Sequence, residues 1–195
     1  MKHRRIMLFL FGFLVVACVG LALANPPAAS KSEALTSSAE DENADGAITS
    51  ILMHRSGCFG FCPIYEVEVT DQGAVTFNGH RFVEKAGKHH RKVTPSQFQQ
   101  IAALVKQIGF FKLQDRYRYE QDGCTTWATD NPTVDIIVTR DSKKKHVSYY
   151  YGCKGPSVAK QIIALSKAID KVTGTSAWIG NGGIPAPPPN RSQTR

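Results

Sequence analysis

Residues 57–65 read Gly57-Cys58-Phe59-Gly60-Phe61-Cys62-Pro63-Ile64-Tyr65, a turn that leads directly into a strand. The turn holds two cysteines, two glycines and a proline. In residues 64–70, which follow, apolar and polar side chains alternate, with Tyr65, Val67 and Val69 on one side. An alternation of period two predicts a β-strand with one buried face, so we expect Tyr65 to point into the core.

The segments on both sides of this turn predict an antiparallel sheet. Residues 48–54 are rich in β-branched and apolar residues and predict a first strand. Residues 71–73 (Asp-Gln-Gly) predict a hairpin turn, with Gly73 where a positive φ is needed, and residues 74–78 predict the returning strand. A further short strand is expected around residues 82–83, after which the basic segment leads out to a helix.

Two segments carry apolar residues at helical spacing. The first begins after Thr94, with Pro95 at its first position and a glutamine placed for a capping box, and it ends at Gly109. The second follows a Pro-Ser pair and ends at Gly174, a residue typical of a helix C-terminus.

A second hairpin is predicted between the two helices, from residues 133–139 and 146–151. The order is therefore strands, helix, strands, helix, with short connections. This order predicts an α+β fold, in which an antiparallel sheet of hairpins has two helices packed on one face.

Four cysteines lie beyond the N-terminal leader: Cys58, Cys62, Cys124 and Cys153. An even number in an exported domain is typical of disulfides, and three pairings are possible. We favour Cys58–Cys62 because only three residues separate the two. We favour Cys124–Cys153 because these residues lie just outside the outer ends of the second hairpin.

A metal or redox role is the alternative for the first pair. Cys58, Cys62 and His54 offer thiolates and an imidazole, which suit Cu(I), and a Cys-x-x-x-Cys pair could also exchange thiols. Copper-delivery loops of the thioredoxin-like class lead into a helix, whereas this one leads into an alternating strand. The disulfide interpretation is therefore preferred, with no metal and no cofactor.

The leader predicts export. Residues 1–24 combine a cationic start, an apolar run and an A-x-A cleavage site, as in a secretory signal peptide. The segment ending at Cys18 also resembles a lipobox, which would make the protein a lipoprotein. We expect a periplasmic, secreted or lipid-anchored protein of the bacterial envelope.

The composition changes twice after the leader. Residues 25–46 are poor in aliphatic residues and predict a flexible acidic linker. Residues 47–179 are expected to form a single α+β domain, and residues 180–195 a disordered Pro-rich tail.

The candidate binding residues lie in a long loop and a basic segment. Residues 115–132 show no period, and loops of this length are usually functional or held by a disulfide. Within this loop, Tyr117, Tyr119 and Trp127 could line a binding groove. Arg91 and Lys92 belong to the basic segment.

The charge bears on the partner. The formal net charge is +8, and the basic clusters at residues 81–92 and 143–145 are most simply explained by solvated loops and edge strands. The alternative is attraction to an anionic envelope surface such as phospholipid headgroups. A protein partner is the other expectation, and direct membrane attachment is expected only through the leader or a lipid anchor. The usual nucleic-acid-binding signatures are absent from this sequence, so no nucleic acid is expected.

The pattern Cys58-x-Gly60-x-Cys62-Pro63-x-Tyr65, followed later by a Thr-Asp-Asn-Pro-Thr segment before a hairpin, resembles an exported bacterial domain family of unknown function. The resemblance covers about residues 48–178 and implies an envelope-associated domain, without an activity or cofactor to carry over. Cys124 and Cys153 lie outside that signature.

Three hypotheses follow for function. The preferred one is a non-enzymatic binding or interaction module stabilised by disulfides. The second is a Cu(I)- or thiol-handling protein. The third is an enzyme that uses loop acids such as Asp122 or Asp130, although no nucleophile motif accompanies them.

Overall fold

The computed structural model describes residues 46–181. The expected leader with Cys18, nearly all of the acidic linker and nearly all of the Pro-rich tail lie outside the described residues. Within the described part of the chain, no helix is long and apolar enough to cross a membrane.

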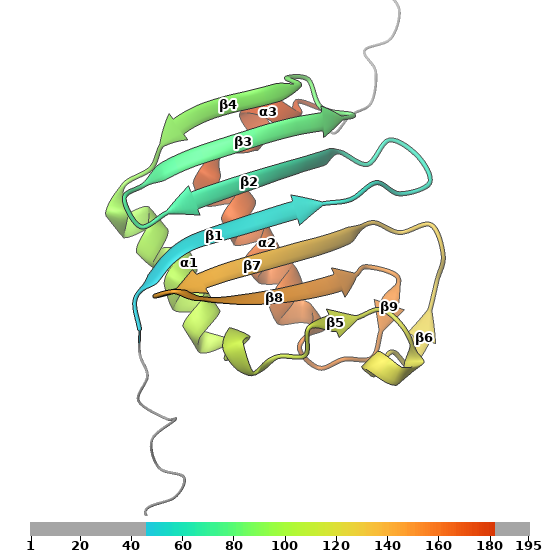
Figure 1. Cartoon of the computed structure of the whole chain (residues 1–195). Helices are drawn as coiled ribbons and strands as arrows, with labels where there is room; N and C mark the ends of the chain where they lie inside the picture. Colours follow the sequence, from blue (N-terminus) through green and yellow to red (C-terminus); the bar gives the residue numbers. More distant parts are fainter. Residues whose placement is uncertain (1–45, 182–195) are drawn as a thin grey trace, which may run out of the picture. The chain divides into compact units, whose positions relative to one another are not determined.

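Seven strands form one sheet in the order β4-β3-β2-β1-β7-β8-β5 (Figure 1). Neighbouring strands are antiparallel, except that β5 runs parallel to β8. The strands are β1 (Ile48–Arg55), β2 (Ile64–Thr70), β3 (Ala74–Arg81), β4 (Gly87–Lys92), β5 (Arg116–Tyr117), β7 (Thr133–Arg140) and β8 (Lys143–Tyr150). A separate small sheet pairs β6 (Thr126–Trp127) with β9 (Cys153–Lys154).

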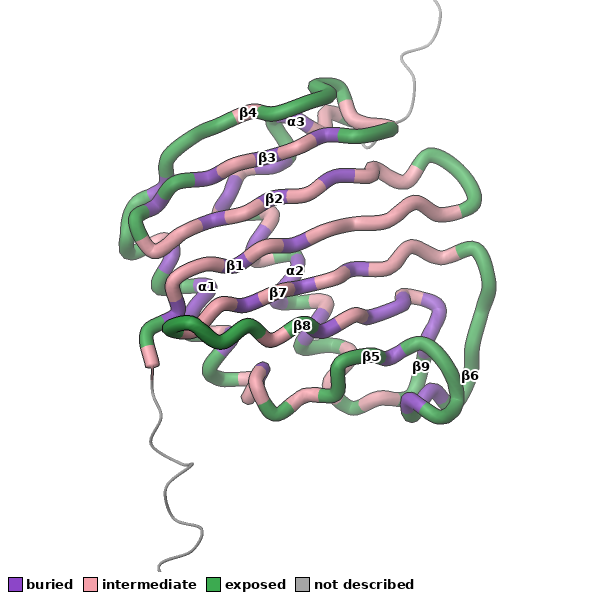
Figure 2. Tube along the Cα trace, in the orientation of Figure 1, coloured by how far each residue is buried: buried purple, intermediate pink, exposed green. Residues whose placement is uncertain are grey.

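The central strands are amphipathic, as the alternation predicts. Tyr65, Val67 and Val69 of β2 are buried, while the residues between them are half-buried on the other face (Figure 2). The same alternation in β7 buries Val134 and Ile136. An antiparallel sheet with one covered face produces this pattern.

Two main helices cover the buried face of the sheet (Figure 1). Helix α1 (Pro95–Gln107) begins with a complete capping box between Thr94 and Gln97. Helix α2 (Ala159–Thr173) ends at Gly174, whose φ of 66° is the left-handed conformation that glycine favours. The predicted α+β fold is confirmed.

A short third helix, α3 (Ser176–Ile179), closes the core beneath β3 and β4. The indole of Trp178 stacks on Phe77 of β3 at 5.0 Å between ring centroids. Trp178 is only 8% exposed, so it covers this end of the core.

The prediction of a short strand at residues 82–83 is wrong. Phe82 has a φ of 54° and lies in the turn between β3 and β4. The basic segment is itself the strand β4, an edge strand whose side chains are almost all exposed. A strand exposed on both faces has no hydrophobic alternation, so periodicity cannot reveal it.

The segment predicted as a long loop contains short regular elements. It holds β5, the 3₁₀ turn Glu120–Asp122 and β6. Another 3₁₀ turn, Phe110–Lys112, follows α1 and buries Phe110.

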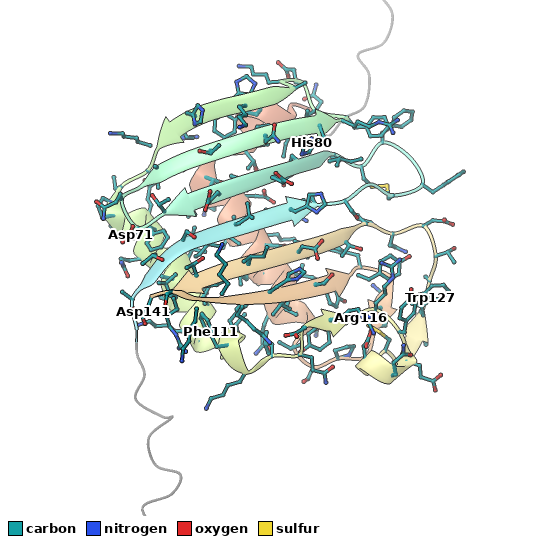
Figure 3. All side chains as sticks on the ribbon, viewed as in Figure 1. Asp71, His80, Phe111, Arg116, Trp127 and Asp141 are labelled. Atoms are coloured by element: carbon teal, nitrogen blue, oxygen red, sulfur yellow. A yellow bond between two sulfur atoms is a disulfide. The ribbon has the colours of Figure 1, made fainter. Side chains whose placement is uncertain are left out.

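The strand directions place four connections at one end of the sheet. These are residues 56–63, 82–86, 118–132 and 151–158. The turns at Asp71 and Asp141 lie at the opposite end, far from Trp127 (Figure 3).

Candidate functional site

The loop between β1 and β2 presents two exposed phenylalanines. A disulfide between Cys58 and Cys62 closes this loop, as expected, with their Cα atoms 5.6 Å apart. The side chain of Phe59 is 89% exposed and that of Phe61 is 55% exposed. Phe61 leans edge-on against Phe82 of the neighbouring turn, at 5.4 Å between ring centroids.

A polar cluster fixes the base of this loop. Arg55, the last residue of β1, pairs across the strands with Tyr65 of β2. The Arg55 guanidinium donates to Asp170 Oδ2 of α2 at 2.7 Å, and Tyr65 Oη donates to Asp170 Oδ1 at 2.5 Å. Thr175 Oγ1 also donates to Asp170, at 2.9 Å. The two strands that carry the loop are therefore attached to the same carboxylate.

Arg55 makes further bonds that complete this cluster. It donates to Tyr65 Oη and Tyr151 Oη, each at 2.9 Å, and to Ser166 Oγ at 3.2 Å. The side chains of Arg55 and Asp170 are 19% and 24% exposed. Every buried side-chain nitrogen and oxygen in the described residues has a hydrogen-bond partner. Because its donors and acceptors satisfy one another, the cluster has a structural role.

The electrostatics of the cluster favour its observed protonation state. Burial lowers the pKa of Arg55, but the charge of Asp170 and the tyrosine oxygens outweigh burial and raise that pKa above its usual value. Burial, followed by the Asp170 charge, raises the pKa of Tyr65 far above its usual value. Tyr65 therefore remains a neutral donor and Arg55 a cation.

A second aromatic group lies beside the first loop. Tyr119 is 39% exposed and Trp127 is 50% exposed, with their rings 6.3 Å apart. Trp127 also lies 6.3 Å from the ring of Tyr150. The Arg118 guanidinium lies over Tyr119 at 5.5 Å and over Tyr150 at 5.3 Å. Cations over aromatic faces at such distances are mutually stabilising.

The second disulfide, Cys124–Cys153, holds this group to the end of β8. Cys153 is fully buried and its carbonyl accepts a bond from Tyr149 Oη at 2.7 Å. Trp127 pairs with Cys153 in the small β6–β9 sheet. The position of Trp127 is thus set by a crosslink and by strand pairing.

Asp122 organises the chain around Tyr119. Its carboxylate accepts from Arg116 Nε at 3.0 Å and from the backbone N–H groups of Arg118 and Tyr119. The bond from Arg116 is the main cause that lowers the pKa of Asp122; burial opposes it and the two backbone donors add to it.

The two loops that carry these aromatic groups are joined by hydrogen bonds. The Phe59 N–H donates to the carbonyl of Asp130 at 3.2 Å, and Thr133 and Ser56 bond to each other. Tyr150 Oη donates to the carbonyl of Ala128 at 2.7 Å. We call the resulting surface the aromatic end: Phe59, Phe61, Phe82, Tyr119 and Trp127.

The aromatic end collects the large apolar side chains that the described part of the chain exposes. Those residues are Phe59, Phe61, Tyr119 and Trp127, and all four lie in connections at one end of the sheet. Figure 2 shows the tips of these connections as exposed, in green. Single exposed apolar side chains scattered over a surface are common, whereas a cluster of them is typical of an interaction surface.

The predicted binding residues are separated by the structure. Tyr119 and Trp127 lie together, but Tyr117 is 5% exposed and packs near Tyr149. Arg91 and Lys92 lie at the far end of β4, opposite the aromatic end, because Lys92 pairs with Ala74. Phe59 and Phe61 were not among the predicted binding residues. Two phenylalanines in an uncharged loop between bridged cysteines are the signal that could have found them.

The proposed metal ligands do not form one group. Cys58 and Cys62 are bonded to each other, and His54 Nδ1 lies 3.5 Å from Asp135 Oδ2 on the open face of the sheet. His146 Nε2 contacts the other Asp135 oxygen at 2.9 Å. Within residues 46–181, no three His, Cys, Asp or Glu residues are placed to hold a metal ion.

These features describe a small disulfide-bonded α+β domain with an aromatic loop surface. Comparison with protein families shows that residues 49–173 match the family described as Domain of unknown function (DUF6438), and the chain belongs to this family. The match runs from β1 to the end of α2 and includes both disulfides. A search of the curated proteins found no match.

Proposed function

We propose that this protein is an exported, non-enzymatic binding module and that the aromatic end is its contact surface. The observation that carries the proposal is the gathering of four exposed large apolar side chains in loops at one end of the sheet. Water contact with so much aromatic surface is unfavourable, and burial in a complex removes that cost.

The way these loops are held supports the same proposal. The disulfide, the Asp170 cluster and the backbone bond to Asp130 fix the Phe59 loop before any partner arrives. A surface that is already ordered loses little conformational entropy on binding. Two disulfides are also typical of an oxidising compartment, in keeping with the leader-like N-terminus.

The experiment compares binding of the full chain to isolated bacterial envelope fragments, measured by cosedimentation. The test variant is Phe59→Ser/Phe61→Ser/Trp127→Ala. The matched control is Lys143→Ser/Lys144→Ser, which changes exposed residues at the opposite end of the sheet. We expect the wild type and the control to sediment with the fragments, and the aromatic variant to remain in solution.

Two results would overturn the proposal. One is a wild-type protein that stays in solution with the fragments. The other is an aromatic variant that sediments as well as the wild type while keeping the wild-type circular dichroism spectrum.

A further inference from the structure

We propose that the aromatic end inserts into the surface of a phospholipid bilayer, with Phe59 and Phe61 entering first. This inference rests on the proposed function and names the partner of the same surface. It adds a contact made by the folded domain to any attachment made by the N-terminal leader.

The aromatic end projects outward instead of enclosing a ligand. Phe59 is the most exposed of the large apolar residues in the described part of the chain. A groove between α1 and α2, lined by Gln100, Leu104 and Val172 among others, includes no residue of the aromatic end. A projecting apolar loop can enter the apolar part of a bilayer, because a bilayer does not require a cavity of matching shape.

The composition of the loop suits entry into lipid. Residues 56–63 contain no charged side chain, so their insertion leaves no ionised group to desolvate. The disulfide and the bond from the Phe59 N–H to Asp130 hold the loop in place. Entry into the headgroup region therefore gains apolar burial without first ordering the chain.

Tyr119 and Trp127 lie beside the tip and provide an amphipathic border. Each has an apolar ring with one polar group, and such residues concentrate at membrane–water interfaces. Both are partly exposed, so lipid can reach their rings. The border would lie at the level of the headgroups when the phenylalanines are inserted.

Two arginines are placed to bind lipid phosphates. Arg81 lies over the ring of Phe82 at 5.0 Å, and Arg118 lies over Tyr119 and Tyr150. Within residues 46–181, neither forms an ion pair with a carboxylate. A guanidinium that stacks on a ring keeps its N–H groups available for the oxygens of a phosphate.

The local charge sets the expected salt dependence. The four connections at this end contain four acids and three basic residues, so they carry no excess of positive charge of their own. The acids are Glu84, Glu120, Asp122 and Asp130, and the basic residues are Lys85, Arg118 and Lys154. The net charge of +8 belongs to the whole chain, so it attracts an anionic surface at long range. We therefore expect apolar insertion to dominate and added salt to weaken binding only modestly.

The experiment measures binding of the full chain to protein-free vesicles of phosphatidylglycerol and phosphatidylethanolamine. A Trp178→Phe background leaves Trp127 as the single tryptophan, so its emission reports on the aromatic end. We expect a blue shift of that emission on vesicle addition and quenching by bromine atoms placed high on the lipid chains.

The variants separate insertion from general attraction. Phe59→Ser/Phe61→Ser is expected to weaken vesicle binding at least tenfold, and Arg81→Gln/Arg118→Gln about threefold to tenfold. Lys143→Ser/Lys144→Ser removes two charges far from the aromatic end and is expected to weaken vesicle binding less than twofold. Because Phe59 and Phe61 are largely exposed, the serine variant is expected to keep the wild-type unfolding transition.

Other outcomes would reject a lipid partner. Sedimentation with envelope fragments but not with vesicles keeps the proposed function and overturns the bilayer inference. Self-association in ultracentrifugation that disappears in Phe59→Ser/Phe61→Ser would assign the surface to a second copy of the chain. Equal vesicle binding by the wild type and this variant would also contradict insertion.

Discussion

At the residue scale, Asp122 shows how one carboxylate can shape the aromatic end. It accepts bonds from the Arg116 side chain and from the backbone of Arg118 and Tyr119. These donors curl the chain so that Tyr119 faces Trp127 and Arg118 lies over the tyrosine ring. Asp122 is a candidate catalytic acid in the sequence analysis, and in the structure its carboxylate is engaged in these hydrogen bonds.

The lowered pKa of Asp122 predicts an acid-sensitive part of the stability. A carboxyl group whose pKa is depressed in the folded state stabilises it above the unfolded pKa, near 3.8, and loses this effect as the pH falls through the folded value. We expect Asp122→Asn to lower the melting temperature at pH 7. We expect its difference from the wild type to shrink between about pH 4 and pH 2.

Thermal unfolding followed across this pH range checks the prediction. Arg116→Gln removes the main cause of the pKa shift and is expected to give a similarly flattened profile. A melting-temperature difference for Asp122→Asn that stays constant down to pH 2 would show that ionisation of this group does not contribute.

At the element scale, the two disulfides differ in what they crosslink. Cys58–Cys62 closes a loop of sequence separation 4, and Cys124–Cys153 joins residues 29 positions apart. In the loop-entropy model, the longer crosslink restricts the unfolded chain more. The shorter one serves mainly to shape the tip that carries Phe59.

The prediction is that removing each bridge has a different result. Cys124→Ser/Cys153→Ser is expected to lower the free energy of unfolding by about 3 to 4 kcal/mol, and Cys58→Ser/Cys62→Ser by about 2 kcal/mol. Urea unfolding monitored by circular dichroism measures both. Equal losses, or a larger loss for the short bridge, would mean that native-state contacts at Cys58 outweigh the loop-entropy effect.

The elements that were predictable from sequence are those with a local signal. Alternation identified β2, and the capping residues around Thr94 identified the start of α1. Strand β4 was missed because an edge strand of lysine, histidine and arginine carries no apolar pattern.

The candidate site was only partly predictable for a related reason. Tyr119 and Trp127 stand out as aromatics within a polar loop, whereas the bond between Arg55 and Asp170 joins residues 115 positions apart. The sequence around Arg55 or around Asp170 carries no signal that predicts their pairing. Their meeting depends on how α2 crosses beneath the ends of β1 and β2.

At the scale of the whole molecule, the core defines where the domain begins and ends. The buried apolar residues of the described part run from Ile48 to Trp178. The family match stops at residue 173, before α3, whose Trp178 stacks on Phe77. We therefore expect a folding unit to include α3, and the boundaries of 47 and 179 remain a prediction.

A fragment comprising residues 47–179 is expected to unfold in one cooperative transition. Its free energy of unfolding should lie within about 0.5 kcal/mol of that of the full chain, because it retains every core contact. A second fragment that ends at residue 173 lacks Trp178 and should be less stable by about 3 kcal/mol or more. Urea titration of the three proteins measures these differences, and similar curves for both fragments would contradict a structural role for α3.

The two ends of the described chain leave the domain in different places. The Ala47 N–H donates to Asp141 Oδ1 at the end of the sheet opposite the aromatic end, whereas Ile179 bonds to Glu84 in the turn that contains Phe82. A purification tag or solid support placed ahead of residue 46 would leave the loops facing solution. The same fusion placed after residue 181 would start beside Phe82 and compete with whatever approaches it, so immobilised assays should use the N-terminal attachment.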